Sequence, residues 1–175
     1  TFGDGGIFST LNAIFLSSSE EDSLNDYAQD LIALFGEGIG KNFERRISGI
    51  NNTGMSVWNT NRDLIRFFIA LGAPVGRKNK QITIHSWIHL TDATEIEFFG
   101  ALLGNELCSP RFSTDQNKIQ YFGIGLAGNY SLKQNRLELL TAIADYLASR
   151  CVSTSPNINE NEFRIGKYIW RLGIS

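Results

Sequence analysis

The sequence has few prolines and cysteines, no long apolar run, and no excess of basic charge. No stretch reaches membrane-spanning length and no signal-peptide pattern begins the chain, so we expect an intracellular protein that is not embedded in a membrane. Three Pro and no low-complexity tract among 175 residues exclude a disordered chain. Cys108 and Cys151 lie far apart and outside any CxxC pair, which argues against a zinc ribbon or a disulfide framework.

The net charge of -2, from 16 basic and 18 acidic residues, counts against a nucleic-acid partner when it is taken for the chain as a whole. The charges are segregated, however. Acidic residues collect in EEDSLNDYAQDLIALF, where apolar residues recur at helical spacing. Basic residues collect in KNFERRISG and FRIGKYIWRLGIS, which have the character of strands. Basic charge is therefore expected on sheet and acidic charge on helix.

Periodicity and turn residues predict the order of the elements. Residues 6–18 predict a strand pair, 18–38 a helix with Ser18 or Ser19 as N-cap and a glycine past its end, 41–59 a hairpin, and 61–72 a second helix. Residues 93–107 predict a helix, 111–128 a strand pair, 135–152 a helix, and 159–175 a closing strand. The pattern strand, strand, helix, strand, strand, helix is thus almost repeated, which predicts a duplicated architecture.

Two carboxylates occupy corresponding places in the two copies. Asp4, in TFGDGGIF, fits an ordinary turn, because glycine supplies positive φ and aspartate accepts backbone hydrogen bonds. Glu106 stands at the C-terminal end of the helix predicted for 93–107, where it faces the negative end of the helix dipole unless a cation compensates. Two such carboxylates, each binding a hard divalent cation, form a site for phosphodiester hydrolysis.

Two further features have competing interpretations. Gly100 and Gly104 lie one turn apart on the same predicted helix, and small residues at that spacing let another backbone approach closely. His85 and His89 are spaced four apart, as in half of a metal site on a helix. No third ligand is evident near the histidines, so surface or packing roles are favoured for both.

Two segments resemble a known family. GDGGI at 3–7 and FFGALLGNEL at 98–107 resemble the two copies of the LAGLIDADG motif, and LIRFFIALGAPVGRKNKQITIHSWI resembles the linker of single-chain, archaeal or intein-like homing endonucleases. The resemblance implies an α+β fold with a pseudo-twofold duplicated αββαββα arrangement, whose two antiparallel sheets form a saddle over DNA. The halves would be 1–72 and 93–175, joined by a linker at 73–92. Most of the first motif helix and the last helix of the second half are expected outside the sequence.

The same resemblance implies a monomeric, site-specific endonuclease that cuts double-stranded DNA with Mg²⁺ or Mn²⁺. Asp4 and Glu106 would bind the metal ions, while Gly3 and Asn105 would offer backbone carbonyls. Lys118 and Lys133 are candidates for the basic residue that polarises water. The candidate DNA contacts are basic residues on predicted strands: Arg45, Arg46, Arg111, Lys118, Arg164, Lys167 and Arg171. A solvated surface charge is the competing interpretation for each of these contacts.

Two alternatives stay open. A maturase-like RNA-splicing cofactor would bind intron RNA with the same fold and would not need both carboxylates. A decayed DNA-binding remnant would keep the fold without activity. The acidic balance of charge and the short segment before Asp4 favour these alternatives, whereas an acidic residue at both motif ends favours the endonuclease.

Overall fold

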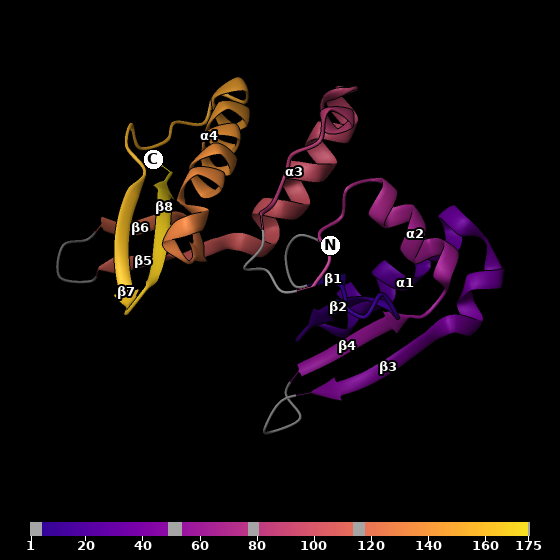
Figure 1. Ribbon diagram of the computed structural model, residues 1–175. Coiled ribbons are helices and arrows are strands. Elements are labelled where there is room, and N and C mark those ends of the chain that lie inside the picture. Colours follow the sequence, from indigo (N-terminus) through magenta and orange to yellow (C-terminus); the bar gives the residue numbers. More distant parts are fainter. Residues whose placement is uncertain (1–4, 49–53, 77–80, 114–117, 175) are drawn as a thin grey trace. The chain divides into compact units, whose positions relative to one another are not determined.

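The computed structural model describes residues 5–48, 54–76, 81–113 and 118–174 (Figure 1). The chain divides into two compact units, residues 1–78 and residues 79–175. The boundary falls inside the segment 73–92 that the sequence suggests as a linker. Each unit has its own sheet and its own apolar core, so each is described separately.

Unit 1 contains a four-stranded antiparallel sheet. Its strands are β1 (Gly5–Ile7), β2 (Ile14–Ser18), β3 (Phe43–Ser48) and β4 (Gly54–Asn59), in the order β1-β2-β4-β3. The helix α1 (Glu21–Phe35), the short η1 (Glu37–Asn42) and α2 (Arg62–Ala70) complete the unit. Two strands come before each of the two α-helices, in the order that the sequence predicts. The turn expected at 51–54 lies mostly outside the described residues.

Both helices of unit 1 cover the same face of the sheet. Ile7 and Ile14 from the sheet form one buried cluster with Leu31 of α1 and Leu64 of α2. Ile14 lies opposite Asn59 and Leu16 opposite Val57, and Val57 is buried as well. Because successive side chains of a strand point to opposite faces, these pairs fix which residues face the helices and which face away. We call the face away from α1 and α2 the open face of unit 1.

The ends of the unit 1 helices differ partly from prediction. The N-cap of α1 is Glu20, which makes no capping hydrogen bond with its side chain, so the predicted Ser18 or Ser19 cap is wrong. Ser18 instead accepts a hydrogen bond from the Glu20 N–H at 3.0 Å, and it lies two residues before the N-cap position. Gly36, at φ 85°, ends α1 as expected, because glycine tolerates the left-handed region.

Asn61 caps α2 with its side chain, since Oδ1 accepts the N–H groups of Asp63 and Leu64, both at 3.0 Å. We expect Asn61→Ala to lower the free energy of unfolding by about 1 kcal/mol, because two helix N–H groups lose their acceptor. Urea denaturation measures the change. Glu20→Ala is the matched control, because the N-cap of α1 contributes no such bond. Equal losses from the two substitutions would contradict this account of the cap.

Unit 2 repeats the arrangement after an additional helix. The helix α3 (Asp92–Glu106) leads into β5 (Leu107–Ser113) and β6 (Lys118–Gly128), and α4 (Lys133–Ser149) precedes β7 (Asn159–Arg164) and β8 (Lys167–Gly173). Short turns of 3-10 helix, η2 (Ser86–His89) and η3 (Tyr130–Leu132), come before α3 and α4. The single closing strand predicted for 159–175 is wrong. It is a hairpin, with Gly166 at φ 69° in its turn.

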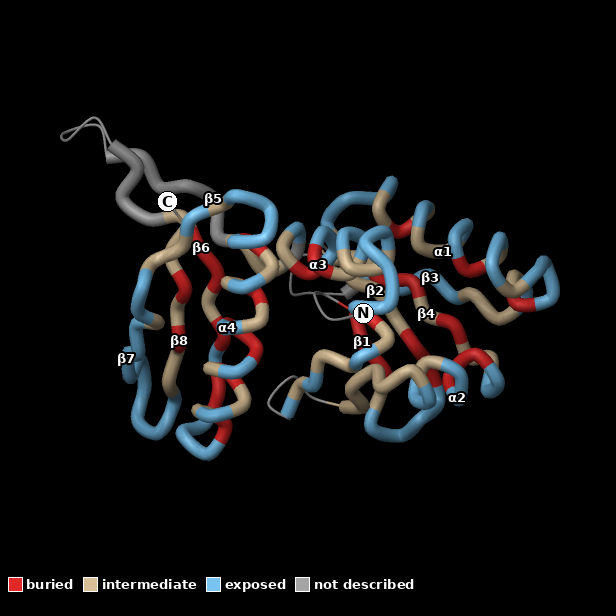
Figure 2. The backbone as a smooth tube through the Cα atoms, turned by 90° about the horizontal axis from the view of Figure 1, so that it is seen from above, coloured by how far each residue is buried: buried red, intermediate tan, exposed pale blue. Residues whose placement is uncertain are grey.

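The core of unit 2 lies between α4 and the sheet. Trp170 and Leu172 of β8 are fully buried, as are Leu140 and Ile143 of α4. Figure 2 shows buried positions along both of these elements. The helix α3 packs on α4 through Phe99, whose ring stacks on Tyr146 at 4.3 Å between centroids. Trp170 also donates its indole N–H to Glu160 of β7 at 2.8 Å.

The sheet of unit 2 has the order β5-β6-β8-β7, the same sequence of pairings as β1-β2-β4-β3 in unit 1. The predicted α+β class with two antiparallel sheets is confirmed by this repetition. None of the helices in the described part of the chain is long and apolar enough to cross a membrane.

Candidate functional site

Glu106 is the last residue of α3, and Leu107 directly after it begins β5. The last turn of α3 contains no basic residue, so nothing in this helix itself offsets the carboxylate at the negative end of the dipole. Glu106 is half-buried. The structure therefore places this carboxylate at a helix-to-strand junction, as the sequence predicts, and compensation must come from another element.

That compensation comes from Arg136 on α4, a residue that the sequence analysis did not select. Its side chain is only 1% exposed, which is rare for an arginine. Burial lowers the pKa of the Arg136 guanidinium from its ordinary value, and the charge of Glu106 opposes this shift. Arg136 also donates from Nη1 to Asn135 Oδ1 at 3.1 Å. A buried cation thus acts electrostatically on the half-buried carboxylate that ends α3.

The sequence does contain a signal for Arg136. It precedes the buried Leu139, Leu140 and Ile143 by three, four and seven residues, so it lies on the apolar stripe of α4. An arginine on the buried stripe of a helix needs a partner, because burying an uncompensated charge is costly. Searching the apolar stripes for charged residues would have found it.

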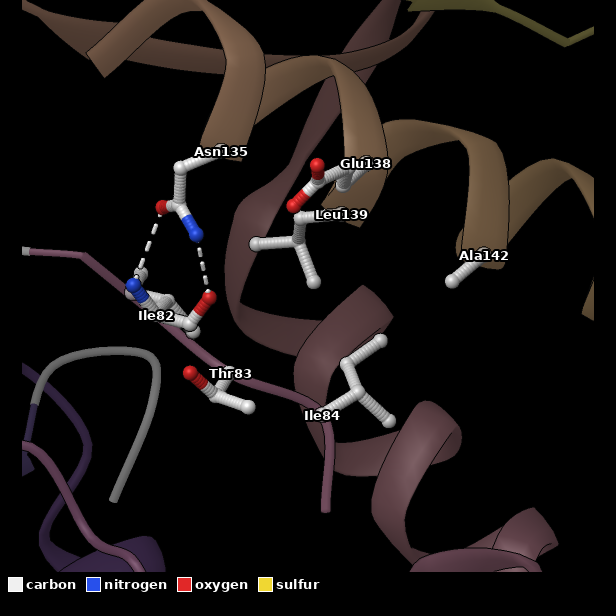
Figure 3. A pocket seen from close by; sticks show the side chains of 7 residues that line it. All are labelled: Ile82, Thr83, Ile84, Asn135, Glu138, Leu139 and Ala142. Atoms are coloured by element: carbon white, nitrogen blue, oxygen red, sulfur yellow. Dashed lines mark hydrogen bonds between the residues drawn. The ribbon is translucent and has the colours of Figure 1, made fainter. Parts of the chain in front are cut away.

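Asn135, the neighbour of Arg136, attaches the segment before η2 to α4. Its Oδ1 accepts the Ile82 N–H at 3.0 Å and its Nδ2 donates to the Ile82 carbonyl at 2.7 Å (Figure 3). Beside this double hydrogen bond is a pocket of about 210 Å³, lined by Ile82, Thr83, Ile84, Asn135, Glu138, Leu139 and Ala142. Farther along, Ile88 of η2 is fully buried. The segment is therefore fixed at both ends.

The other predicted metal-site residues cannot be placed. Asp4 and Gly3 lie outside the described residues, and Asn105 is described only as a backbone position of α3. Within the described part of the chain, no group of three or more His, Cys, Asp or Glu side chains is placed to hold a metal ion. Glu106 offers a hard oxygen donor, and magnesium commonly takes one or two carboxylates together with water and substrate phosphate. Glu106 therefore fits one side of a magnesium or manganese site.

The two adjacent arginines of β3 face opposite sides of the unit 1 sheet. Arg45 ion-pairs with Glu21 of α1 at 2.7 Å and also contacts Asn25, so it lies on the helix face. Arg46 lies on the open face, with its guanidinium carbon 3.7 Å from the centroid of the Trp58 ring. It also ion-pairs with Glu44 at 2.7 Å. Of this predicted pair, only Arg46 is on the face away from the helices.

On the sheet of unit 2, Arg171 lies on the face away from α4. It is opposite Asn159 on one side and Gly125 on the other, and it alternates along β8 with the buried Trp170 and Leu172. The Arg171 side chain crosses Gly125, because Arg171 Cγ lies 3.5 Å from the position that a Cβ on this glycine would take. Because directly paired residues of neighbouring strands point to the same face, Asn159 and Arg171 lie together on the face away from α4.

The remaining predicted contacts are less informative. Arg164 and Lys167 are exposed and paired across the β7–β8 hairpin, and Lys167 contacts Asn129. Arg111 and Lys118 lie on β5 and β6, and their side chains are outside the described part of the structure. Lys133, a candidate for polarising water, ion-pairs with Glu160 at 2.8 Å, and its pKa is raised mainly by that hydrogen bond.

The two histidines lie differently from a helical metal pair. His89 Nδ1 is 2.7 Å from Glu95 Oε1, and His85 precedes η2 as its N-terminal flanking residue. Gly100 and Gly104 are exposed, and nothing in the described part of the chain lies within 4 Å of a Cβ built on either. The close approach that their spacing suggests is therefore not made by a described residue.

Comparison with solved structures identifies the class of this fold, although no family model and no curated sequence matches the chain. Three structures of the homing endonuclease I-DmoI are similar. A variant bound to its target DNA, nicked in the coding strand, with Mn has a TM-score of 0.53 at 14% identity, over 93% of this chain and 73% of that one. I-DmoI with DNA and Ca gives 0.51 at 16% identity, over 93% and 68%. I-DmoI with DNA and Mn gives 0.52 at 16% identity, over 93% and 73%.

At these identities the likeness shows the fold alone. The chain has the fold of a LAGLIDADG homing endonuclease, the family that its two motif segments and linker resemble. In these three structures I-DmoI is bound to DNA in the presence of Mn or Ca.

Proposed function

We propose that the chain is a metal-dependent endonuclease that cuts double-stranded DNA at a specific site, as homing endonucleases do. The observation that carries this proposal is Glu106, half-buried at the junction of α3 and β5 under the influence of the buried Arg136. The shared fold with DNA-bound homing endonucleases supports it.

In this proposal Glu106 and Asp4 bind Mg²⁺ or Mn²⁺, and the backbone carbonyls of Gly3 and Asn105 complete the protein's share of the site. When bound, such an ion polarises the phosphoryl oxygens and lowers the pKa of water. Arg136 has a positioning role. Its positive charge offsets the negative charge of Glu106 at a helix terminus that has no basic residue of its own, which helps to hold the carboxylate in place.

The face of unit 2 that carries Arg171 and Asn159 is proposed to meet the DNA, together with the open face of unit 1 that carries Arg46. Arginine and asparagine are the side chains that read guanine and adenine edges in the major groove. Arg164 and Lys167, exposed at the hairpin end of β7 and β8, are proposed as phosphate contacts. Arg45 is assigned a structural role instead, because its guanidinium is paired with Glu21.

Arg171→Ala is expected to weaken duplex binding about tenfold, the cost of one lost arginine contact to a base edge. Fluorescence anisotropy with a labelled duplex measures the change in affinity. Arg45→Ala is the matched control, since it removes the same charge from the helix face of a sheet and should leave binding nearly unchanged.

Two results would overturn this assignment. If Arg45→Ala weakened binding as much as Arg171→Ala, net charge rather than a defined face would govern DNA binding. If the protein bound structured RNA and no duplex DNA, the maturase-like function would replace the endonuclease.

A further inference from the structure

The open face of unit 1 carries an unusual aromatic cluster. Phe15 of β2 and Trp58 of β4 are paired across the sheet, and they alternate with the buried Ile14 and Val57, so they project away from the helices. Phe8, just after β1, stacks on Phe15 at 4.5 Å between centroids and contacts Trp58 at 4.4 Å. All three are half-exposed. We call Phe8, Phe15 and Trp58 the aromatic patch.

Among the described residues of unit 1, the charge around the aromatic patch is balanced. Arg46 covers the Trp58 ring, and its charge is offset by Glu44 in an ion pair whose two side chains are about half exposed. The Trp58 indole N–H is also satisfied, because it donates to Ser56 Oγ at 2.9 Å. The patch thus offers apolar ring surface without net positive charge. Phosphate binding depends on net positive charge, so the patch is poorly suited to the DNA backbone.

An apolar surface on a DNA-facing sheet has one natural counterpart. In the major groove, the C5-methyl group of thymine is the apolar feature among hydrogen-bonding base edges, and aromatic side chains contact it. Stacking on unpaired bases would need open ring faces. Here Phe8 and Phe15 are stacked on each other, and Arg46 covers Trp58. The rings are therefore poorly placed to stack on unpaired bases.

We propose that the aromatic patch reads pyrimidine 5-methyl groups in the major groove of duplex DNA, so that unit 1 favours a thymine-rich half of the target. This inference rests on the proposed function, since it requires that the open face of unit 1 meets a duplex. It assigns specificity to Phe8, Phe15 and Trp58, and it separates the two sheets by chemistry: apolar readout in unit 1 and polar readout around Arg171 in unit 2.

Two pairs of short duplexes, each differing only in the methyl group, test the proposal. One pair alternates dA with dT or with dU, and the other alternates dG with 5-methyl-dC or with dC. The protein is expected to bind the methylated member of each pair about three- to fivefold more tightly per methyl group contacted, as burial of one methyl group predicts. Competition binding followed by fluorescence anisotropy measures the ratios.

Two variants test whether the preference for methylated duplexes depends on the aromatic patch. Phe15→Ser should remove the preference, so that the methylated and unmethylated members of each pair bind with equal affinity. Phe67→Ser is the matched control, because Phe67 is a 44% exposed phenylalanine of the same unit on α2, away from the open face. It should keep the full preference. Circular dichroism confirms that both variants are folded.

The outcomes distinguish this inference from the function on which it rests. Salt-dependent duplex binding with equal affinity for methylated and unmethylated duplexes would overturn the inference and leave the proposed function standing. The methyl comparison needs only the wild-type protein, so it decides even if Phe15→Ser does not fold. Absence of any duplex binding would overturn both. Tighter binding of single-stranded DNA or RNA than of duplex, abolished by Phe15→Ser, would show a base-stacking surface instead and overturn the inference.

Discussion

Replacing Glu106 with glutamine should abolish double-strand cleavage by the whole gene product in Mg²⁺, lowering the rate by about a thousandfold or more, because several kcal/mol of stabilisation depend on the bound ion. The substitution removes the negative charge that binds the cation and keeps the size of the side chain. Asp4→Asn should have the same effect. Plasmid linearisation under single-turnover conditions measures the rate.

A lower cleavage rate can be assigned to the chemical step only if these variants still bind DNA. Affinity measured in Ca²⁺, the ion present in one of the neighbouring DNA complexes, should be unchanged or improved, since a repulsive carboxylate has been neutralised. Glu97→Gln is the control, because Glu97 is an exposed carboxylate of the same helix α3. Wild-type cutting by Glu106→Gln would disprove the metal-ligand assignment.

Replacing Arg136 with methionine should lower the free energy of unfolding by about 3 kcal/mol, the lower end of the cost of leaving a buried charge without its opposite charge, because half-buried Glu106 can be hydrated in part. Adding Glu106→Gln to that variant should recover part of the loss, since the carboxylate left without its cation is then removed. Urea denaturation of the two single variants and the double variant gives the coupling free energy.

Arg150→Met provides the comparison for a surface arginine. Arg150 follows α4 and pairs with the exposed Asp92, so its removal should destabilise the protein far less than removal of Arg136. A coupling free energy between Arg136 and Glu106 no larger than about 0.5 kcal/mol would mean that the two groups act independently. Arg136 would then serve packing rather than the carboxylate.

The order of helices and strands was predictable because apolar periodicity and glycine positions are strong local signals. The errors lie where local signals compete. Serines beside Glu20 offered a better N-cap than the residue that the chain uses, and the hairpin at Gly166 was overlooked inside a run of strand-forming residues. Both depend on tertiary context, which decides where a helix begins and whether a glycine turns the chain.

The site was predictable only in part. The position of Glu106 at the end of a helix was predictable because it is visible in the motif, whereas Arg136 was missed because arginine is expected on surfaces. The choice between Arg45 and Arg46 was available from the sequence FERRIS. Arg45 alternates in phase with Phe43 and Ile47, and Phe43 packs against the core. The aromatic patch had no local signal, because Phe8, Phe15 and Trp58 meet only when three strands pair.

The double hydrogen bond between Asn135 and Ile82 has a consequence for how this chain tolerates changes in length. An amide side chain presents the same donor and acceptor as a peptide group, so Asn135 holds Ile82 as a neighbouring strand would, at one residue only. Insertions on the N-terminal side of Ile82 leave that attachment intact. Residues inserted between Ile82 and the buried Ile88 would have to form a bulge, or else break the Asn135–Ile82 hydrogen bonds or displace Ile88 from the core. We therefore expect related proteins to differ in the number of residues before Ile82 and to have the same number of residues between Ile82 and Ile88.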